Sequence, residues 1–224
     1  KNPSDDDGYT PLHLAVEYEH LEIVKYFVQF LDNPDLLYMI SEKYNKKQPN
    51  GRTPLHEAGQ NGDLSTVHHI CDLLQDKNPA DENQFTPLHL AARYGHLDIV
   101  QFLEPQLENK FPKSGSIKYE GTLGEWHGMT PLHEAAVNGH LKVIEYFLTF
   151  VDDDINPPQG IGFTVLHISA YFGHLNVVSY YAKKLHNINP STAEGWTPFN
   201  LAAQNGHLNI VSFYTEILDN PNPK

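Results

Sequence analysis

The sequence predicts an all-α solenoid, in which short helix pairs stack one on the next along the chain. Three observations support this fold class. With small variations, a pentad that begins Thr-Pro-Leu-His occurs six times, a Gly-His-Leu mark follows each copy at a fixed distance, and Asn-Pro turns recur between the copies. One unit of this size cannot bury its own apolar face, whereas stacked units form a continuous core.

The spacing of the pentads defines the units. Their threonines are separated by 43, 33, 44, 34 and 33 residues, so the two longer spacings indicate inserted segments. The six threonines are Thr10, Thr53, Thr86, Thr130, Thr164 and Thr197. We predict a single domain over residues 1–224, with units at roughly 2–33, 45–77, 78–108, 122–155, 156–188 and 189–221.

Each pentad predicts the start of a short helix. The threonine is a natural N-cap, and the following proline fits the first helical turn, where its missing N–H costs nothing. A small residue such as Ala91 lets the neighbouring unit approach closely. A glycine such as Gly95, nine residues after Thr86, then ends this helix in a left-handed cap.

The leucine of the Gly-His-Leu mark predicts the start of a second helix in each unit. In the third unit Leu97, Ile99, Val100 and Leu103 have the spacing of one helical face. An Asn-Pro pair such as Asn189-Pro190 marks a turn between units. One unit is therefore turn, helix, turn, helix.

The combined pattern G-x-TPLH-x-A-A-x-x-GH-L closely resembles the ankyrin repeat family. The resemblance covers essentially the whole chain outside the two insertions. It implies a stack of antiparallel helix pairs with hairpin-like fingers projecting from one side. It also implies that the fingers and first helices form a concave surface that binds other proteins.

Composition excludes several classes of function. The formal net charge is −13, and nucleic-acid binding requires lysine and arginine to neutralise phosphates, so we expect no nucleic-acid partner. No apolar run is long enough to predict a membrane-spanning helix. The single cysteine, Cys71, excludes an internal disulfide and favours an intracellular, cytoplasmic setting. Its apolar neighbours in the array predict a buried, inert thiol.

The histidines favour a structural role over a chemical one. Ten of the fourteen occupy the two repeated positions, where we expect them to hydrogen-bond backbone groups within and between units. The other four are His68, His69, His127 and His186. The motifs HExxH, CxxC, GxxxxGK and GxSxG are absent, so we predict no catalytic residue, metal or cofactor.

Positions that vary between units predict the partner-binding surface. They are the residue before each threonine and the residues seven and eight after it, which the resemblance places on the concave surface. Aromatic side chains and arginine dominate interface hot spots. With Trp126 of the second insertion, the predicted contacts are Tyr9, Tyr18, Arg52, Phe85, Arg93, Tyr94, Trp126, Met129, Phe163, Tyr171, Phe172 and Trp196. The alternative is that the finger aromatics pack on the next finger.

The two insertions lie within residues 34–50 and 104–127. Long loops in compact arrays are often functional, so we expect the insertions to widen or shape the binding surface. A tolerated surface loop is the alternative, because lengthening a loop costs little.

The sequence therefore predicts a non-enzymatic module, monomeric on its own, that binds an unidentified protein. The alternatives are an architectural segment of a larger repeat protein and, third, a hidden hydrolase or metal site.

Overall fold

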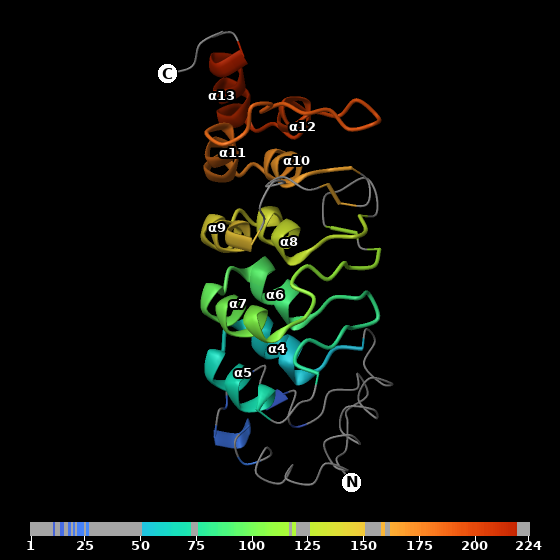
Figure 1. The fold of residues 1–224 in the computed structure, drawn as a ribbon, viewed down its shortest axis with the longest axis vertical. Coiled ribbons are helices and arrows are strands. Elements are labelled where there is room, and N and C mark those ends of the chain that lie inside the picture. The colour runs from blue at the N-terminus through green and yellow to red at the C-terminus, as the bar shows by residue number, and fades with distance from the viewer. Residues whose placement is uncertain are drawn as a thin grey trace.

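The fold of this computed structural model is a single column of stacked helix pairs (Figure 1). The structure describes residues 51–72, 76–116, 118–119, 126–150, 158–159 and 162–218, with single positions at 11, 14–15, 18, 20, 22–24 and 26. An isolated β-bridge joins Pro158 and Thr164, and the described residues form no β-strand. The predicted all-α solenoid is confirmed.

Five units of the predicted helix–turn–helix form are described. Their first helices are α4 (Pro54–Asn61), α6 (Pro87–Tyr94), α8 (Pro131–Val137), α10 (Val165–Tyr171) and α12 (Pro198–Gln204). Their second helices are α5 (Leu64–Cys71), α7 (Leu97–Leu103), α9 (Leu141–Phe147), α11 (Leu175–Ala182) and α13 (Leu208–Leu218). Short 3-10 helices η1 (Glu104–Gln106) and η2 (Leu148–Phe150) extend α7 and α9. The insertion predicted within residues 34–50 lies outside the described residues.

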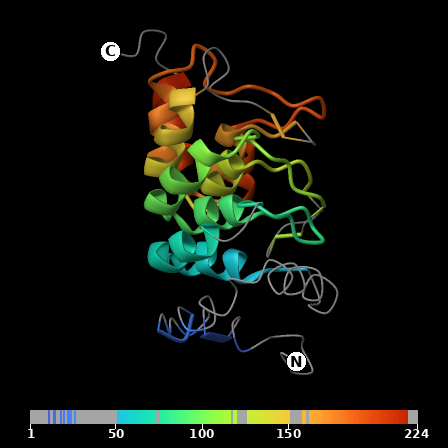
Figure 2. The same cartoon turned by 60° about the horizontal axis from the view of Figure 1, so that its bottom comes forward.

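The first helices pack against one another in sequence order, α4 on α6, α6 on α8, α8 on α10 and α10 on α12. Small residues such as Ala91 and Ala135 are fully buried at these contacts. The second helices form an outer column, and the fingers project from the opposite side in both views (Figures 1 and 2).

The pentad histidine both caps its own helix and joins it to the next unit. Nδ1 of His89 accepts a hydrogen bond from the N–H of Thr86 at 3.1 Å, which completes a capping box. Because Nδ1 accepts, Nε2 carries the proton, and it donates to the carbonyl of Met129 in the following finger at 3.1 Å. His56 and His167 reach the carbonyls of Phe85 and Trp196 in the same way.

The second repeated histidine packs against the glycine of the preceding unit. Gly139 has φ +71°, and a Cβ atom there would lie 2.5 Å from Nδ1 of His174. His174 Nε2 donates to the carbonyl of Val137 at 2.7 Å, so the ring cannot move away without losing this bond. The same contact joins the pairs Gly62–His96, Gly95–His140 and Gly173–His207.

The finger of the fourth unit contains the second insertion. In the sixth unit Thr192 N–H bonds to the carbonyl of Trp196, Gly195 N–H bonds to that of Thr192, and two residues form the tip. Ser114 and Gly128 make the same pair of bonds, but thirteen residues, 115–127, separate them. We call residues 115–127 the finger-tip insertion.

The insertion therefore lengthens the tip of a finger and does not precede it. Ser114 corresponds to Thr192, so Phe111-Pro112 corresponds to Asn189-Pro190. We accordingly place the start of the fourth unit near residue 111, in place of the expected 122.

Gln84→Gly is expected to stabilise the protein. Gln84 is the one described non-glycine residue with positive φ, at 59°, and it stands where the other fingers have glycine. A side chain in the left-handed region costs about 1–2 kcal/mol, partly offset by the greater freedom of glycine in the unfolded chain. We expect the free energy of unfolding in urea to rise by about 1 kcal/mol. Asn83→Gly, without a positive φ, should lower it, and an unchanged Gln84→Gly variant would contradict the assignment.

Gly139→Ala is expected to cost far more stability than Gly206→Ala. Both glycines have positive φ, but a Cβ at Gly139 meets the His174 ring, whereas a Cβ at Gly206 meets nothing within 4 Å. We expect losses of roughly 3 kcal/mol and roughly 1 kcal/mol, measured by chemical unfolding. Equal losses would show that the glycine–histidine contact does not hold the units together.

Candidate partner-binding surface

The ends of the first helices and the adjoining fingers form one surface, which we call the inner-helix surface. Figure 1 shows the first helices as a column between the outer helices and the fingers. The residues seven and eight after each threonine lie at the ends of these helices, for example Arg93 and Tyr94 at the end of α6.

Three of the predicted contact residues are large and exposed. Tyr18 is 64% exposed, Tyr94 is 47% exposed and Trp196 is 41% exposed. Tyr18 and Tyr94 occupy the same repeat position, and Trp196 lies in the finger of the sixth unit. Tyr9 lies outside the described residues.

Four predicted contacts are buried, so the expectation that they line an open surface is wrong. Phe85, Trp126, Met129 and Phe163 are between 0% and 7% exposed. Phe85 and Phe163 turn into the stack, where their rings lie 5.2 and 5.5 Å from those of His89 and His167. These finger residues pack within the array, as the alternative interpretation of the sequence expected.

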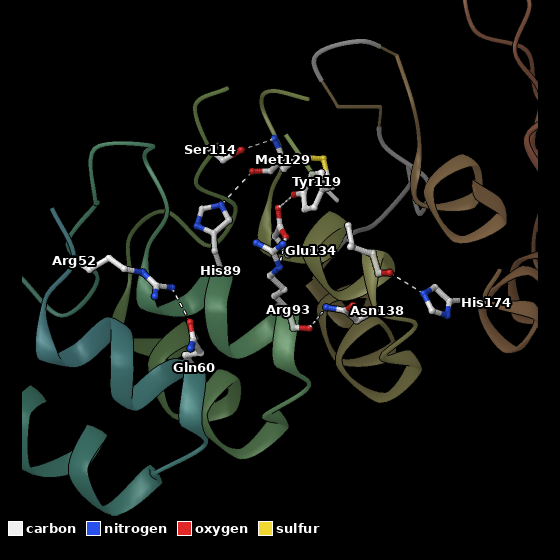
Figure 3. A network of polar contacts seen from close by, with 11 residues as sticks. Arg52, Gln60, His89, Arg93, Ser114, Tyr119, Met129, Glu134, Asn138 and His174 are labelled. Atoms are coloured by element: carbon white, nitrogen blue, oxygen red, sulfur yellow. Dashed lines mark hydrogen bonds and ion pairs between the residues drawn. The ribbon is translucent and has the colours of Figure 1, made fainter. Parts of the chain in front are cut away.

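Arg52 is held by its own unit. Its guanidinium group lies 3.2 Å from Oε1 of Glu57. It also donates to Oε1 of Gln60 at 2.9 Å (Figure 3). Glu57 is buried, so this ion pair compensates a carboxylate that the stack removes from water. Arg52 is therefore part of a polar network within its own unit.

Two described residues of the finger-tip insertion, Tyr119 and Trp126, pack on the inner-helix surface. The centroid of its Trp126 ring lies 5.4 Å from those of Phe163 and Tyr171 and 5.7 Å from that of Phe172. Tyr119 packs edge-on against Trp126 and Phe172 at 5.5 and 6.1 Å. Tyr171 and Phe172, predicted as partner contacts, thus contact two residues of the same chain.

A buried polar group holds Tyr119 (Figure 3). Its hydroxyl donates to Oε1 of Glu134 on α8, and Glu134 is 0% exposed. From the end of α6, Nε of Arg93 lies 3.9 Å from Oε2 of Glu134. The Arg93 guanidinium carbon lies 4.9 Å from the Tyr119 ring centroid, a cation–π contact.

Comparison with protein families identifies the architecture. A model described as ankyrin repeats (3 copies) matches residues 30–114 and 150–216, and one described as ankyrin repeat matches 7–37 and 127–157. The chain belongs to the ankyrin repeat family. The matches leave out residues 115–126, nearly the whole finger-tip insertion. No curated protein matches the chain significantly.

Ankyrin repeats are generally protein–protein interaction modules and typically lack enzymatic activity. The described residues contain no group of three or more histidine, cysteine, aspartate or glutamate side chains that could hold a metal ion. Among the described helices, none combines the length and the apolar character needed to cross a membrane.

Buried titratable groups in this ankyrin array suit structural roles. Cys71 is buried, as predicted, and burial raises the pKa of its thiol to about 11, which favours the protonated form. Burial also lowers the pKa of His89 to about 4, so this ring is neutral near pH 7. A neutral ring is what its two backbone hydrogen bonds require.

Sequence reasoning missed Glu134 and Tyr119. The equivalent positions in other ankyrin units hold Leu90, Ile168 and Leu201, all buried. The sequence did offer one sign of the buried polar group, because a glutamate stands where most units have leucine or isoleucine. Glu57 occupies the same position in the second unit. Each of these two glutamates pairs with an arginine.

Glu134→Gln is expected to steepen the rise of stability between pH 5 and pH 7. Burial raises the folded-state pKa of Glu134 to about 7, although Arg93 and the Tyr119 hydrogen bond lower it. The unfolded group titrates near 4.3, so the folded state binds more protons and Glu134 makes stability fall as pH rises. Buried His89 acts oppositely, because its lowered pKa makes stability fall as pH drops below about 6.5.

Removing Glu134 should therefore increase the slope of the free energy of unfolding by up to about 1.4 kcal/mol per pH unit. Urea unfolding at pH 5, 6 and 7 measures it. The exposed Glu216→Gln provides the control. An unchanged slope in Glu134→Gln would contradict the raised pKa.

Proposed function

We propose that this ankyrin array is a non-enzymatic module that binds a partner protein through the inner-helix surface. The observation that carries the proposal is that Tyr94 and Trp196 are 47% and 41% exposed on the surface where the chain already seats Tyr119 and Trp126. Exposed aromatic side chains beside a packed aromatic cluster are typical of interface hot spots.

Rigidity supports this role. Histidine contacts of two kinds join neighbouring units in the described part of the chain through backbone carbonyl groups, as His89 and His174 illustrate. A surface fixed before binding loses less conformational freedom when the partner arrives. The array acts by presenting side chains in set positions.

The net charge limits the classes of partner that we expect, and the free cysteine indicates where in the cell the array acts. The formal charge of −13 favours a partner with a positive patch and disfavours nucleic acid. The buried, unpaired Cys71 fits an intracellular location. We propose that the array binds as a monomer.

Tyr94→Ala/Trp196→Ala is expected to weaken capture of the native partner. Hot-spot aromatics contribute about 2 kcal/mol or more each, so affinity should fall about 30-fold for each substitution and on the order of 1,000-fold for the double variant. Affinity capture from the native source with wild-type and variant protein, followed by titration of the captured protein, measures the change. Light scattering checks that both proteins are monomers.

Tyr26→Ala supplies the matched control, because Tyr26 is 58% exposed but lies outside the inner-helix surface, in the second helix of its unit. A partner bound equally by wild-type protein and the double variant would refute this surface. Oligomers at micromolar concentration would favour the architectural alternative.

A further inference from the structure

Two side chains of the finger-tip insertion, Tyr119 and Trp126, anchor it to the array, in the way that a few side chains anchor a bound peptide. Tyr119 and Trp126 are 3% and 4% exposed. The described neighbours Ser116, Lys118 and His127 are exposed. Among the described residues of the insertion, Tyr119 and Trp126 are therefore the buried ones, and Ser116, Lys118 and His127 face solvent.

The receiving surface has a polar part that the stack itself does not need. Other units place Leu90 or Ile168 where the fourth unit has Glu134, and they stack in the same way. A buried carboxylate destabilises the fold unless it is paired and hydrogen-bonded. Its partners here are Arg93 and the hydroxyl of Tyr119. The pair therefore selects a ring that carries a hydroxyl.

The second part of the receiving surface is apolar and aromatic. Phe163, Tyr171 and Phe172 surround the indole of Trp126, with interplanar angles of 84°, 74° and 57°. Edge-to-face packing of this kind favours large aromatic rings over aliphatic side chains. The two parts lie side by side, since the Tyr119 and Trp126 rings are 5.5 Å apart.

We infer that the inner-helix surface of units three to five is a peptide-binding site for segments that pair a tyrosine with a second large aromatic side chain. The finger-tip insertion occupies this site in cis. The inference rests on the proposed function and names the chemistry of its ligand. A partner segment of the same chemistry binds by displacing Tyr119 and Trp126.

Because the insertion occupies the site in cis, a partner needs a minimum affinity to displace it. A short flexible tether gives an effective concentration on the order of millimolar, so a site of micromolar affinity is almost always filled by the insertion. A partner must bind more tightly than the insertion or add contacts beyond it. Tyr94, exposed and next to Arg93, is available for such contacts.

The test uses the insertion itself as a probe in trans. A labelled peptide of residues 115–127 is titrated, by fluorescence anisotropy, against wild-type protein and against Tyr119→Ala/Trp126→Ala, which lacks both anchors. We expect micromolar binding to the double variant and at least about tenfold weaker binding to wild-type protein, whose site is filled.

Specificity is tested by changing each side of the contact. The peptide with Tyr119→Phe should bind about tenfold more weakly, whereas Lys118→Ala, which changes an exposed side chain, should leave binding unaltered. Introducing Glu134→Leu, the residue of the third unit, into the double variant should abolish the difference between the tyrosine and phenylalanine peptides. Independent effects of the two changes would contradict the assigned hydrogen bond.

A second variant without the anchors, a deletion, controls for misfolding of the Tyr119→Ala/Trp126→Ala protein; we call these two variants the receptors. Deleting residues 116–126 leaves Gly115 and His127 as a two-residue tip, the length found in the sixth-unit finger. Circular dichroism verifies the fold of both receptors. If a folded receptor fails to bind the peptide at millimolar concentration, or if both receptors fail to fold, the inference is wrong. Because the probe comes from this chain, that failure leaves the separate test of Tyr94 and Trp196 unaffected.

Discussion

Neutral histidine side chains that hydrogen-bond the backbone of a neighbouring unit are the interaction on which this stack depends. His89 reaches forward to the finger carbonyl of Met129, and His174 reaches back to the carbonyl of Val137. Each junction of this kind is held both at the finger and at the turn between its helices. Burial keeps such rings neutral, because a charged imidazole in that environment would lose its hydration without gaining an opposite charge.

These two anchors decide where the variable side chains stand. The carbonyl of Arg93 accepts a hydrogen bond from Asn138 of the next unit, so the end of α6 is fixed against α8 (Figure 3). The Arg93 guanidinium is thereby presented above the Tyr119 ring and beside Glu134. The backbone groups that join the units therefore also position the variable side chains at the ends of the first helices.

The buried glutamates show how polar groups fix the arrangement of neighbouring segments. Glu57 and Glu134 replace apolar residues at a core position, and each needs a charged partner to remain there. Arg52 belongs to the same unit as Glu57, whereas Glu134 depends on Arg93 from the preceding unit and Tyr119 from the finger-tip insertion. A polar group whose partners come from separate segments specifies their arrangement more strictly than an apolar contact, because leaving it unpaired is costly.

The sequence by itself determined the repeat, the helix starts at residues such as Thr86, the glycine caps and the buried Cys71, because these follow from local spacing and capping chemistry. It predicted the length of the second insertion but not the residue at which the insertion begins, since the distance between two threonines is the same wherever the extra residues lie. Only the tertiary structure decided that Met129 and Trp126 are buried and that Tyr119 meets Glu134. Whether a side chain faces solvent or a neighbouring unit depends on which segment covers it. The covering segment here is an insertion outside the repeat pattern, so its position could not be predicted from the spacing.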